Sequence, residues 1–381
     1  MTGDGTGAAS SPGGRAAASA PVLWPGLDGA AQRRFRLVVL GDVMIEARAD
    51  LPGVRFADVA ADRLAYAPAR AVVAGTAVNM ARCATGYFRR VAVLGKIGDD
   101  AFTPVIRREL RRMGVRDLLC VEPGAPNGVA MMLRDGAAHP DAVPPADGRE
   151  AAGDGPAGRA ADWRAEPPGD NREDGRGGPT GQGADGRRGV RLLVVDDQGP
   201  GRRLTESEVR RAGRAIRHAD ALFADGYALL APVSRAALRA AVQVAREAGT
   251  LVAFDLVPHD IDRRLPAAEA MPVLEAADVV ITEVPTLARL LGLPVPCDAA
   301  GVREMLPALD RTVRGRPLWL LRHGPSALED VVAYRREHVL MEYPSGYGPR
   351  VRRTGFGDRL AAGELYWWLS LRSSGGAPGS R

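Results

Sequence analysis

Short apolar runs alternate with helical patterns along most of this chain. The run RLVVLGD at 36–42 has no polar alternation, which is typical of a strand buried on both faces of a sheet. Runs of the same kind stand at 91–100, 221–227, 251–258, 278–283 and 318–324. Helical spacing is found between them, at 75–88, 101–115, 205–219, 233–248 and 284–292. Strands that alternate with helices predict a three-layer α/β/α fold, in which a mostly parallel sheet lies between two layers of helices.

Polar side chains follow several of these predicted strands directly. They are Asp42, Asp225, Asp255, Glu283 and His323. In parallel sheets of this kind, ligands bind beyond the carboxyl ends of the strands. The sequence therefore predicts a ligand site at that edge of the sheet.

Other segments lack the α/β pattern. Residues 1–33 and 136–189 are rich in Gly, Ala and Pro and contain few large aliphatic side chains. Such segments cannot bury enough apolar surface to offset the cost of ordering, so we expect a disordered tail and a disordered insertion. We expect a second disordered tail at 373–381. The remainder, 34–372, then forms one domain that contains the insertion.

A small β-rich lid is predicted beside the main sheet. The segment 43–74 has short apolar runs broken by Pro and Gly and shows no clear helix. Strand-like runs flank the insertion, near 126–135 and 190–198, and we assign them to the same lid. Closing a long flexible loop costs only slightly more than closing a short one, so the insertion fits the turn of a hairpin.

Composition narrows the classes of function. The net charge of +5 comes from scattered arginines, so we expect no nucleic-acid partner. Lys96 is the only lysine and Ile97 follows it, which excludes a P-loop. Cys83, Cys120 and Cys297 lie far apart, and we expect buried apolar residues rather than zinc ligands or a disulfide framework. A signal-peptide pattern and an apolar run of ~20 residues are both missing, so we expect a cytoplasmic protein without a membrane partner.

The stretch RTGFGDRLAAGELYWWL at 353–369 joins a Gly-x-Gly-Asp turn to a helical pattern. The first turn of a helix has free N–H groups and a partial positive charge. Gly355 and Gly357 let the backbone approach an anion closely. Asp358 is also a good N-cap, so the motif by itself fits an ordinary capped helix start as well as an anion site.

This stretch resembles the C-terminal signature of the ribokinase-like (PfkB) carbohydrate kinase family, D-T-x-G-A-G-D-x-F-x-x-G. The matching residues are Thr354, Gly355, Gly357, Asp358 and Gly363. The resemblance implies that the backbone of Gly355, Phe356 and Gly357 forms an anion hole for the transferring phosphoryl group. It also implies that Asp358 accepts the proton of the attacking hydroxyl, that Thr354 contacts the nucleotide, and that ATP and Mg²⁺ are required. Such a site suits phosphoryl transfer, which depends mainly on positioning and charge stabilisation.

A second stretch, 74–115, resembles the N-terminal signatures of the same family, G-G-x-x-x-N-x-A followed by G-x-x-G-x-D. The resemblance implies that Gly75 and Asn79 bind substrate hydroxyls, while Asn79 alone also fits a capping amide. GDVMIE at 41–46 resembles the first strand of the family and its substrate-contact segment. Asp42 or Glu46 would then bind sugar hydroxyls, because a carboxylate accepts two hydrogen bonds, although either also fits a turn residue.

Several positions depart from the family pattern. Arg352 stands where the family has Asp, and Phe356 replaces a small Ala, which predicts a crowded anion hole. The N-x-x-E motif of the family aligns with Glu283, a candidate for organising Mg²⁺-bound water. Its nucleotide-side T-x-G aligns with Arg322 and Gly324, which are candidates for nucleotide contact.

The sequence therefore predicts an ATP-dependent phosphotransferase that acts on a hydroxyl of a sugar, polyol or related small molecule. The alternative is a catalytically degenerate protein that binds a sugar or nucleotide as a sensor or scaffold, because the N-x-x-E motif is altered and only a short segment follows Asp358. A dehydrogenase is disfavoured, since GDVMIE stands where G-x-G-x-x-G would follow the first strand. The resemblance also allows a homodimer through the lid.

Overall fold

The computed structural model divides the chain into two compact units. Residues described in it are 33–51, 54–56, 59, 64–135, 191–257, 261–348 and 355–374. Unit 1 comprises 1–47, 71–131 and 194–381, and unit 2 comprises 48–70 and 132–193, in each case as far as they are described. Apart from Arg33, the predicted N-terminal tail lies outside the described residues, and so do the predicted insertion and Thr354.

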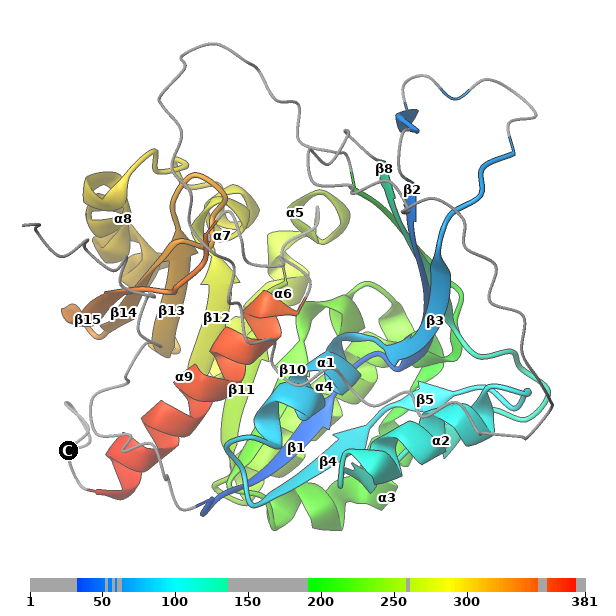
Figure 1. Cartoon of the computed structure of the whole chain (residues 1–381). Coiled ribbons are helices and arrows are strands. Elements are labelled where there is room, and N and C mark those ends of the chain that lie inside the picture. The colour runs from blue at the N-terminus through cyan, green and yellow to red at the C-terminus, as the bar shows by residue number, and fades with distance from the viewer. Residues whose placement is uncertain are drawn as a thin grey trace, which may run out of the picture. The chain divides into compact units, whose positions relative to one another are not determined.

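A nine-stranded, mostly parallel sheet forms the centre of unit 1 (Figure 1). Its strand order is β15-β14-β13-β12-β11-β10-β1-β4-β6. The bounds are β1 (Arg36–Leu40), β4 (Arg90–Leu94), β6 (Arg116–Asp117), β10 (Ala221–Asp225), β11 (Leu251–Asp255), β12 (Val279–Glu283), β13 (Leu318–His323), β14 (Asp330–Arg335) and β15 (His338–Pro344). Two neighbouring pairs in this sheet are antiparallel, β13 with β14 and β14 with β15. The predicted three-layer α/β/α class with a mostly parallel sheet is confirmed.

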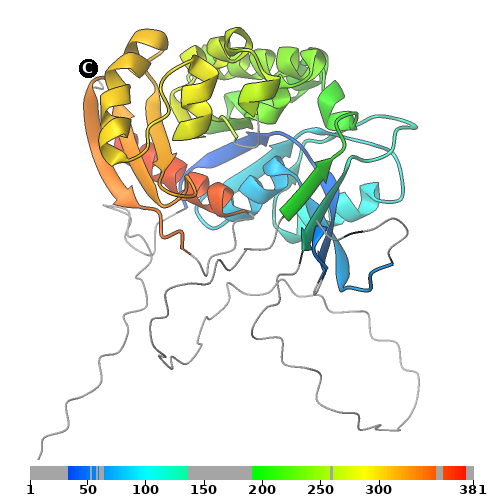
Figure 2. The same cartoon turned by 90° about the horizontal axis from the view of Figure 1, so that it is seen from above.

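Helices cover both faces of this sheet, as Figures 1 and 2 show. One layer contains α1 (Thr76–Ala84), α2 (Thr103–Arg112) and α9 (Phe356–Ser373). The other contains α3 (Glu206–Arg217), α4 (Pro232–Glu247), α5 (Ile261–Arg264), α6 (Ala267–Ala276), α7 (Val284–Leu291) and α8 (Ala299–Thr312). Strand side chains alternate between the two layers with a period of two, so Phe223 packs toward α1 and α9 whereas Leu222 and Ala224 pack toward α4.

A four-stranded sheet of order β3-β2-β8-β9 contains the strands of the segments predicted to form a lid. Its strands are β2 (Met44–Leu51), β3 (Ala69–Ala74), β8 (Val129–Asp135) and β9 (Arg191–Val195). Within unit 2, Asp50 pairs with Arg134 at 3.8 Å and the Phe56 amide donates to Asp135 at 3.2 Å. Two short strands, β5 (Lys96–Ile97) and β7 (Cys120–Val121), pair separately.

Local sequence chemistry explains where single elements begin. α3 starts with a capping box, in which Thr205 Oγ1 accepts from the Glu208 amide and the Glu208 carboxylate accepts from the Thr205 amide. The expectation of three buried cysteines is wrong: Cys83 and Cys120 are only partly buried, and Cys297 is exposed because it lies in the surface loop between α7 and α8. In the described part of the chain, we find no helix long and apolar enough to span a bilayer.

Candidate functional site

Carboxylates gather at the carboxyl edge of the central sheet. β10 ends in Asp225 and β11 ends in Asp255, and the two residues lie directly opposite each other in the parallel register. Both occupy strand positions that face the layer of α1 and α9, because Phe223 and Ala253, two residues earlier, pack there. Their exposed fractions are only 1% and 8%. The strand alternation therefore directs two buried acids toward one side of the sheet edge.

Asp42 and Asp225 are neighbouring carboxylates, and the charge of Asp42 acts on the protonation of Asp225. Thr76 Oγ1 donates to Asp225 Oδ2, and the Tyr227 amide donates to Asp225 Oδ1 at 2.9 Å. The guanidinium of Arg202 lies 3.2 Å from Asp42 Oδ2, and both side chains are nearly buried. Burial and, to a lesser extent, the charge of Asp42 together raise the pKa of Asp225 to about 7. Burial likewise raises the pKa of Asp42, against the opposing effect of Arg202.

Two glycines allow these groups to approach so closely. A Cβ on Gly41 would lie 2.1 Å from Asp225 Oδ2, so any side chain there would displace the carboxylate. A Cβ on Gly75 would lie 2.2 Å from the carbonyl oxygen of Asp42, and Gly75 has a φ of 102°. The glycine that the family signature places before α1 is thus required by packing as well as by backbone conformation.

The start of α9 is an uncapped helix terminus. Gly355 adopts the left-handed conformation at φ 75°, and no side chain caps the helix. Helical hydrogen bonding begins with the Arg359 amide donating to the Gly355 carbonyl at 3.1 Å, so the first-turn amides have no intrahelical acceptor. Phe356 is buried and its ring packs on Tyr347 at 5.0 Å between centroids. The predicted crowding of the turn by Phe356 is therefore wrong, since the ring lies in the core.

Asp358 lies in this first turn and is half-buried. Burial and, to a lesser extent, the neighbouring Asp255 carboxylate together raise its pKa to about 7. Arg322, the backbone amide of Asp358 itself and Arg82 act in the opposite direction. A carboxyl group that changes protonation near neutrality can take up a proton from a substrate and release it to solvent.

A buried ion pair supports the first turn of α9. Arg322 Nη2 donates to the Gly357 carbonyl and to Glu364 Oε2, both at 3.1 Å. The hydroxyl of Tyr343 donates to Glu364 Oε1 at 2.7 Å. Arg322 is 4% exposed and Glu364 is fully buried, so each charge depends on the other. Burial raises the pKa of Asp255 to about 6, while Arg322 lowers it.

The structure brings several of the predicted site residues together. α1, which carries Asn79, packs against α9, which carries Asp358 (Figure 1). Asn79 Oδ1 accepts from Arg82 Nη1 at 3.3 Å, and the charge of Arg82 reaches Asp358. Gly75 lies against Asp42, as its missing side chain allows. The residues predicted to bind the acceptor and those predicted to bind the phosphate therefore lie at the same carboxyl edge of the sheet as Asp225 and Asp255.

Three further predicted residues, Glu46, Glu283 and Gly324, lie on strands or turns near this edge. Glu46 follows β1 on β2 and is buried. Glu283 ends β12 opposite Arg322 of β13, and Gly324 follows β13 with a φ of 109°. A Cβ on Gly324 would lie 2.6 Å from Glu329, so the turn requires glycine. Thr354 lies outside the described residues.

Some residues of the site were not assigned by sequence reasoning. Asp225 and Asp255 had a signal, because each ends a buried strand. Arg202, Thr76 and Glu364 had none, since their partners are distant in sequence. Such contacts depend on tertiary folding and leave no local pattern.

The residues present fit Mg²⁺ only in part. Within the described ranges, we find no group of three His, Cys, Asp or Glu side chains that could hold a metal ion. Mg²⁺ in phosphate-transferring sites usually takes one or two carboxylates and completes its shell with phosphate oxygens and water. The buried Asp255 and the strand-end Glu283 supply carboxylates of that kind.

Comparisons with known proteins bear on the fold. No family model and no curated protein matches the chain. An adenosine kinase from Sinorhizobium meliloti has a TM-score of 0.59 at 17% identity, covering 88% of each chain. A ribokinase from Arabidopsis thaliana, complexed with ribose and ATP, has a TM-score of 0.59 at 14% identity, covering 88% of this chain and 86% of that one.

A protein from E. coli assigned as Ribokinase II, in complex with ATP and Mg²⁺, is similar over 90% of this chain and 87% of its own. Its TM-score is 0.60 and its identity 14%. At such identities the similarity reaches the fold and no further. This chain has the ribokinase-like fold.

Proposed function

We propose that this protein transfers the γ-phosphoryl group of ATP to a hydroxyl of a sugar or related small molecule. One observation carries the proposal: Asp358 lies in the uncapped first turn of α9 with a pKa raised to about 7. A general base is most effective when its pKa lies near the working pH. The fold and the ATP-bound neighbours of the same fold support the assignment.

In the proposed reaction, Asp358 takes the proton of the acceptor hydroxyl while the oxygen of that hydroxyl attacks the γ-phosphorus. The bond from the γ-phosphorus to the bridging oxygen breaks, and ADP leaves with that electron pair. Charge on the transferring group is stabilised by the first-turn amides of Gly355, Phe356 and Gly357, which have no acceptor within the helix. Arg322 holds this turn through the Gly357 carbonyl and adds a positive charge behind it.

The acceptor is proposed to bind beside the start of α1. Asp42 presents a carboxylate held by Arg202, and such a carboxylate accepts hydrogen bonds from two hydroxyls. Gly75 and Asn79 lie at the N-terminal end of α1, which packs against α9. We assign Glu46 to the same role because it follows in the same segment as Asp42.

We place the nucleotide toward the ends of β12 and β13. Gly324, Thr354 and Arg322 are the proposed nucleotide-side residues, and Glu283 would organise Mg²⁺-bound water. Bound Mg²⁺ would neutralise charge on the phosphates of ATP. The chain itself contributes the buried Arg322–Glu364 pair, which fixes where the anion hole lies.

An ADP-release screen against sugars, sugar phosphates and nucleosides tests the proposal. We expect acceptor-dependent ADP release with at least one class, well above the hydrolysis seen without acceptor. Calorimetry on the same ligands runs in parallel. Ligand binding without ADP release from any acceptor would contradict the proposed transfer and favour a binding protein instead.

A further inference from the structure

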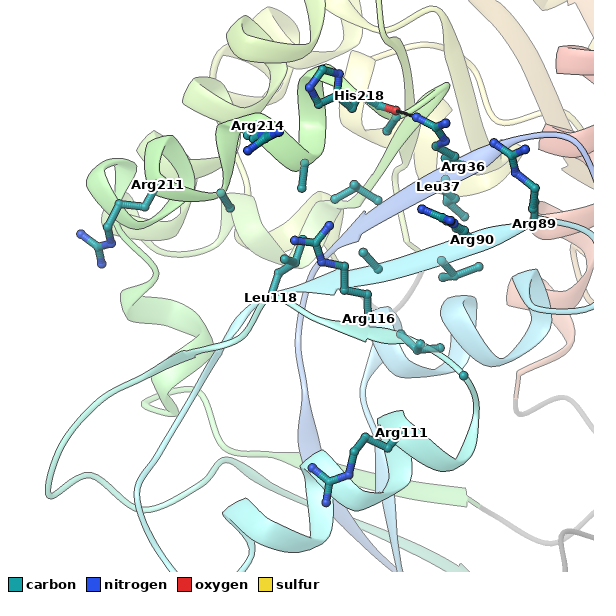
Figure 3. A pocket seen from close by; sticks show the side chains of 18 residues that line it. Arg36, Leu37, Arg89, Arg90, Arg111, Arg116, Leu118, Arg211, Arg214 and His218 are labelled. Atoms are coloured by element: carbon teal, nitrogen blue, oxygen red, sulfur yellow. Dashed lines mark hydrogen bonds between the residues drawn. The ribbon is translucent and has the colours of Figure 1, made fainter.

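A groove of about 1320 Å³ lies at the amino edge of the central sheet, within unit 1. It is bounded by the starts of β1, β4 and β6 and by the second half of α3 (Figure 3). Because parallel strands run from this edge to the opposite one, the groove is separated from Asp42, Asp225 and Asp255 by the length of the strands. It is therefore a different place from the proposed catalytic site.

Arginines surround this groove. Strand starts and the residue before β4 contribute Arg36, Arg89, Arg90 and Arg116, while helices contribute Arg111, Arg211 and Arg214. All seven are exposed, and no acidic residue is among the described residues that line the groove. Its floor is apolar and includes Leu118 and Ala215. Figure 3 shows Arg90, Arg116 and Arg214 arranged about the open space.

The arginine charges are not balanced within the protein. In the part of the chain that the structure describes, none of the seven guanidinium groups forms an ion pair. Two acids close to these arginines in sequence have other partners: Asp220 accepts from the backbone amide of Arg36 at 2.7 Å, and Asp117 pairs with Arg107 at 3.5 Å. Like charges gathered in a concave surface raise the local concentration of anions.

Helix dipoles account for only part of this cluster. Arg111 and Arg214 lie in the last turns of α2 and α3, where a positive charge is favourable. The guanidinium of Arg36 donates to the His218 carbonyl at the C-cap of α3 at 3.3 Å, so it too lies at a helix C-terminus. Arg90 and Arg116 each begin a strand of the sheet. A ligand that neutralises several guanidinium groups at once explains these two.

We propose that this groove binds a small anion that carries several linked phosphate groups. Guanidinium groups bind phosphate oxygens through paired, charge-assisted hydrogen bonds. Single-phosphate ligands would use only a few of the seven charges, whereas a triphosphate chain reaches arginines from both the strands and α3. The volume exceeds that of a common small-molecule pocket, so a nucleoside attached to the phosphates also fits over the apolar floor.

Calorimetry with inorganic tripolyphosphate and with ATP, at fixed ionic strength, tests the site. The groove variant is Arg90→Ser/Arg116→Ser/Arg214→Ser. Its matched control is Arg264→Ser/Arg311→Ser/Arg314→Ser, which removes the same charge from exposed arginines elsewhere. We expect tripolyphosphate to bind the groove variant at least about tenfold more weakly, and the control as tightly as the unchanged chain.

Mapping arginine modification distinguishes this site from the proposed catalytic one. With phenylglyoxal and mass spectrometry, tripolyphosphate should protect Arg90, Arg116 and Arg214 but leave Arg311 and Arg314 reactive, in the unchanged chain and in Asp358→Asn. Stronger protection of Arg90, Arg116 and Arg214 by ATP than by tripolyphosphate would identify a nucleotide as the ligand of the groove, and equal protection a bare phosphate chain. Equal affinity in the groove and control variants would overturn the proposal. So would binding of single-stranded DNA at salt where tripolyphosphate does not bind.

Discussion

The two edges of the central sheet carry opposite charges in opposite settings. At the carboxyl edge, Asp225 and Asp255 are buried, and their pKa values are raised to about 7 and about 6. At the amino edge, seven arginines surround a groove, and all of them are exposed. At the carboxyl edge, burial makes the few charged groups energetically costly. At the amino edge, exposure to water makes the many charged groups cost little free energy.

Buried and exposed charges respond to different experiments. Burying a charge is expensive, so a buried acid that changes protonation near neutrality indicates chemistry at that atom. Exposed arginines are screened by salt and change the stability of the fold little, so a role for them is detected by measuring anion binding. Stability and pH experiments therefore report on the carboxyl edge, and binding experiments report on the amino edge.

The largest contrast should appear when one arginine is removed from each edge. Arg322→Met leaves Glu364 buried without its ion-pair partner, and we expect a loss of about 3 kcal/mol in the free energy of unfolding. Arg116→Met removes an exposed charge, and we expect a change below about 0.5 kcal/mol. Urea denaturation measures both.

A second substitution tests the reason for that contrast. Adding Glu364→Leu to Arg322→Met removes the orphaned carboxylate, so stability should partly return. Equal losses for Arg322→Met and Arg116→Met would show that the two edges do not differ as described.

The pH dependence of turnover should follow Asp358. Its folded-state pKa is raised from 3.8 to about 7, so the protonated form, which cannot act as a base, persists until about pH 7. We expect kcat/KM to rise about tenfold per pH unit below that value and to level off above it. Asp255→Asn removes a charge that raises this pKa and should move the inflection to lower pH. An inflection that stays in place in Asp255→Asn would contradict the coupling, and the groove variant serves as the unchanged control.

Acceptor binding should depend on Asp42. Asp42→Asn abolishes the charge that Arg202 holds in place, and we expect KM for the acceptor to rise about tenfold with a smaller change in kcat. Steady-state kinetics give both constants. Asp330→Asn changes an exposed carboxylate on β14 and should leave them unaltered. An unchanged KM in Asp42→Asn would place the acceptor elsewhere.

The smallest expected difference between the two edges is in their response to salt. Raising the NaCl concentration should weaken tripolyphosphate binding progressively, since exposed charges are screened over about 10 Å at moderate ionic strength. The pH inflection assigned to Asp358 should shift little, because burial is the main cause of its raised pKa. Titrations across a salt series would show this, and a salt-independent affinity would contradict an electrostatic groove.

Much of the fold could be predicted from the sequence because the buried strands are continuous apolar runs. β14 and β15 gave no hairpin signal, since their turn uses Arg336 and Glu337 at positive φ where glycine is usual. α6 and α8 were hidden because each contains an internal proline, Pro272 and Pro307. In these places tertiary packing overrides local preference.

The sequence predicted the backbone of the candidate site better than the contacts between its side chains. The Gly-x-Gly-Asp turn identified Asp358 and the start of α9. Glu364 looked like any polar helix position, yet it is fully buried because Arg322 and Tyr343 meet it there. Phe356 suggested a crowded turn, but its ring packs into the core. Side-chain direction, which spacing alone does not give, decided these cases.

Single-turnover transfer of radiolabelled γ-phosphate to the acceptor found by the screen tests the central claim most directly. Unchanged protein, Asp358→Asn and Asp330→Asn would be compared after calorimetry has shown that all three bind ATP. We expect transfer to be about 10³-fold slower in Asp358→Asn and unchanged in Asp330→Asn. Transfer by Asp358→Asn at the rate of the unchanged protein would show that this carboxylate is not the base.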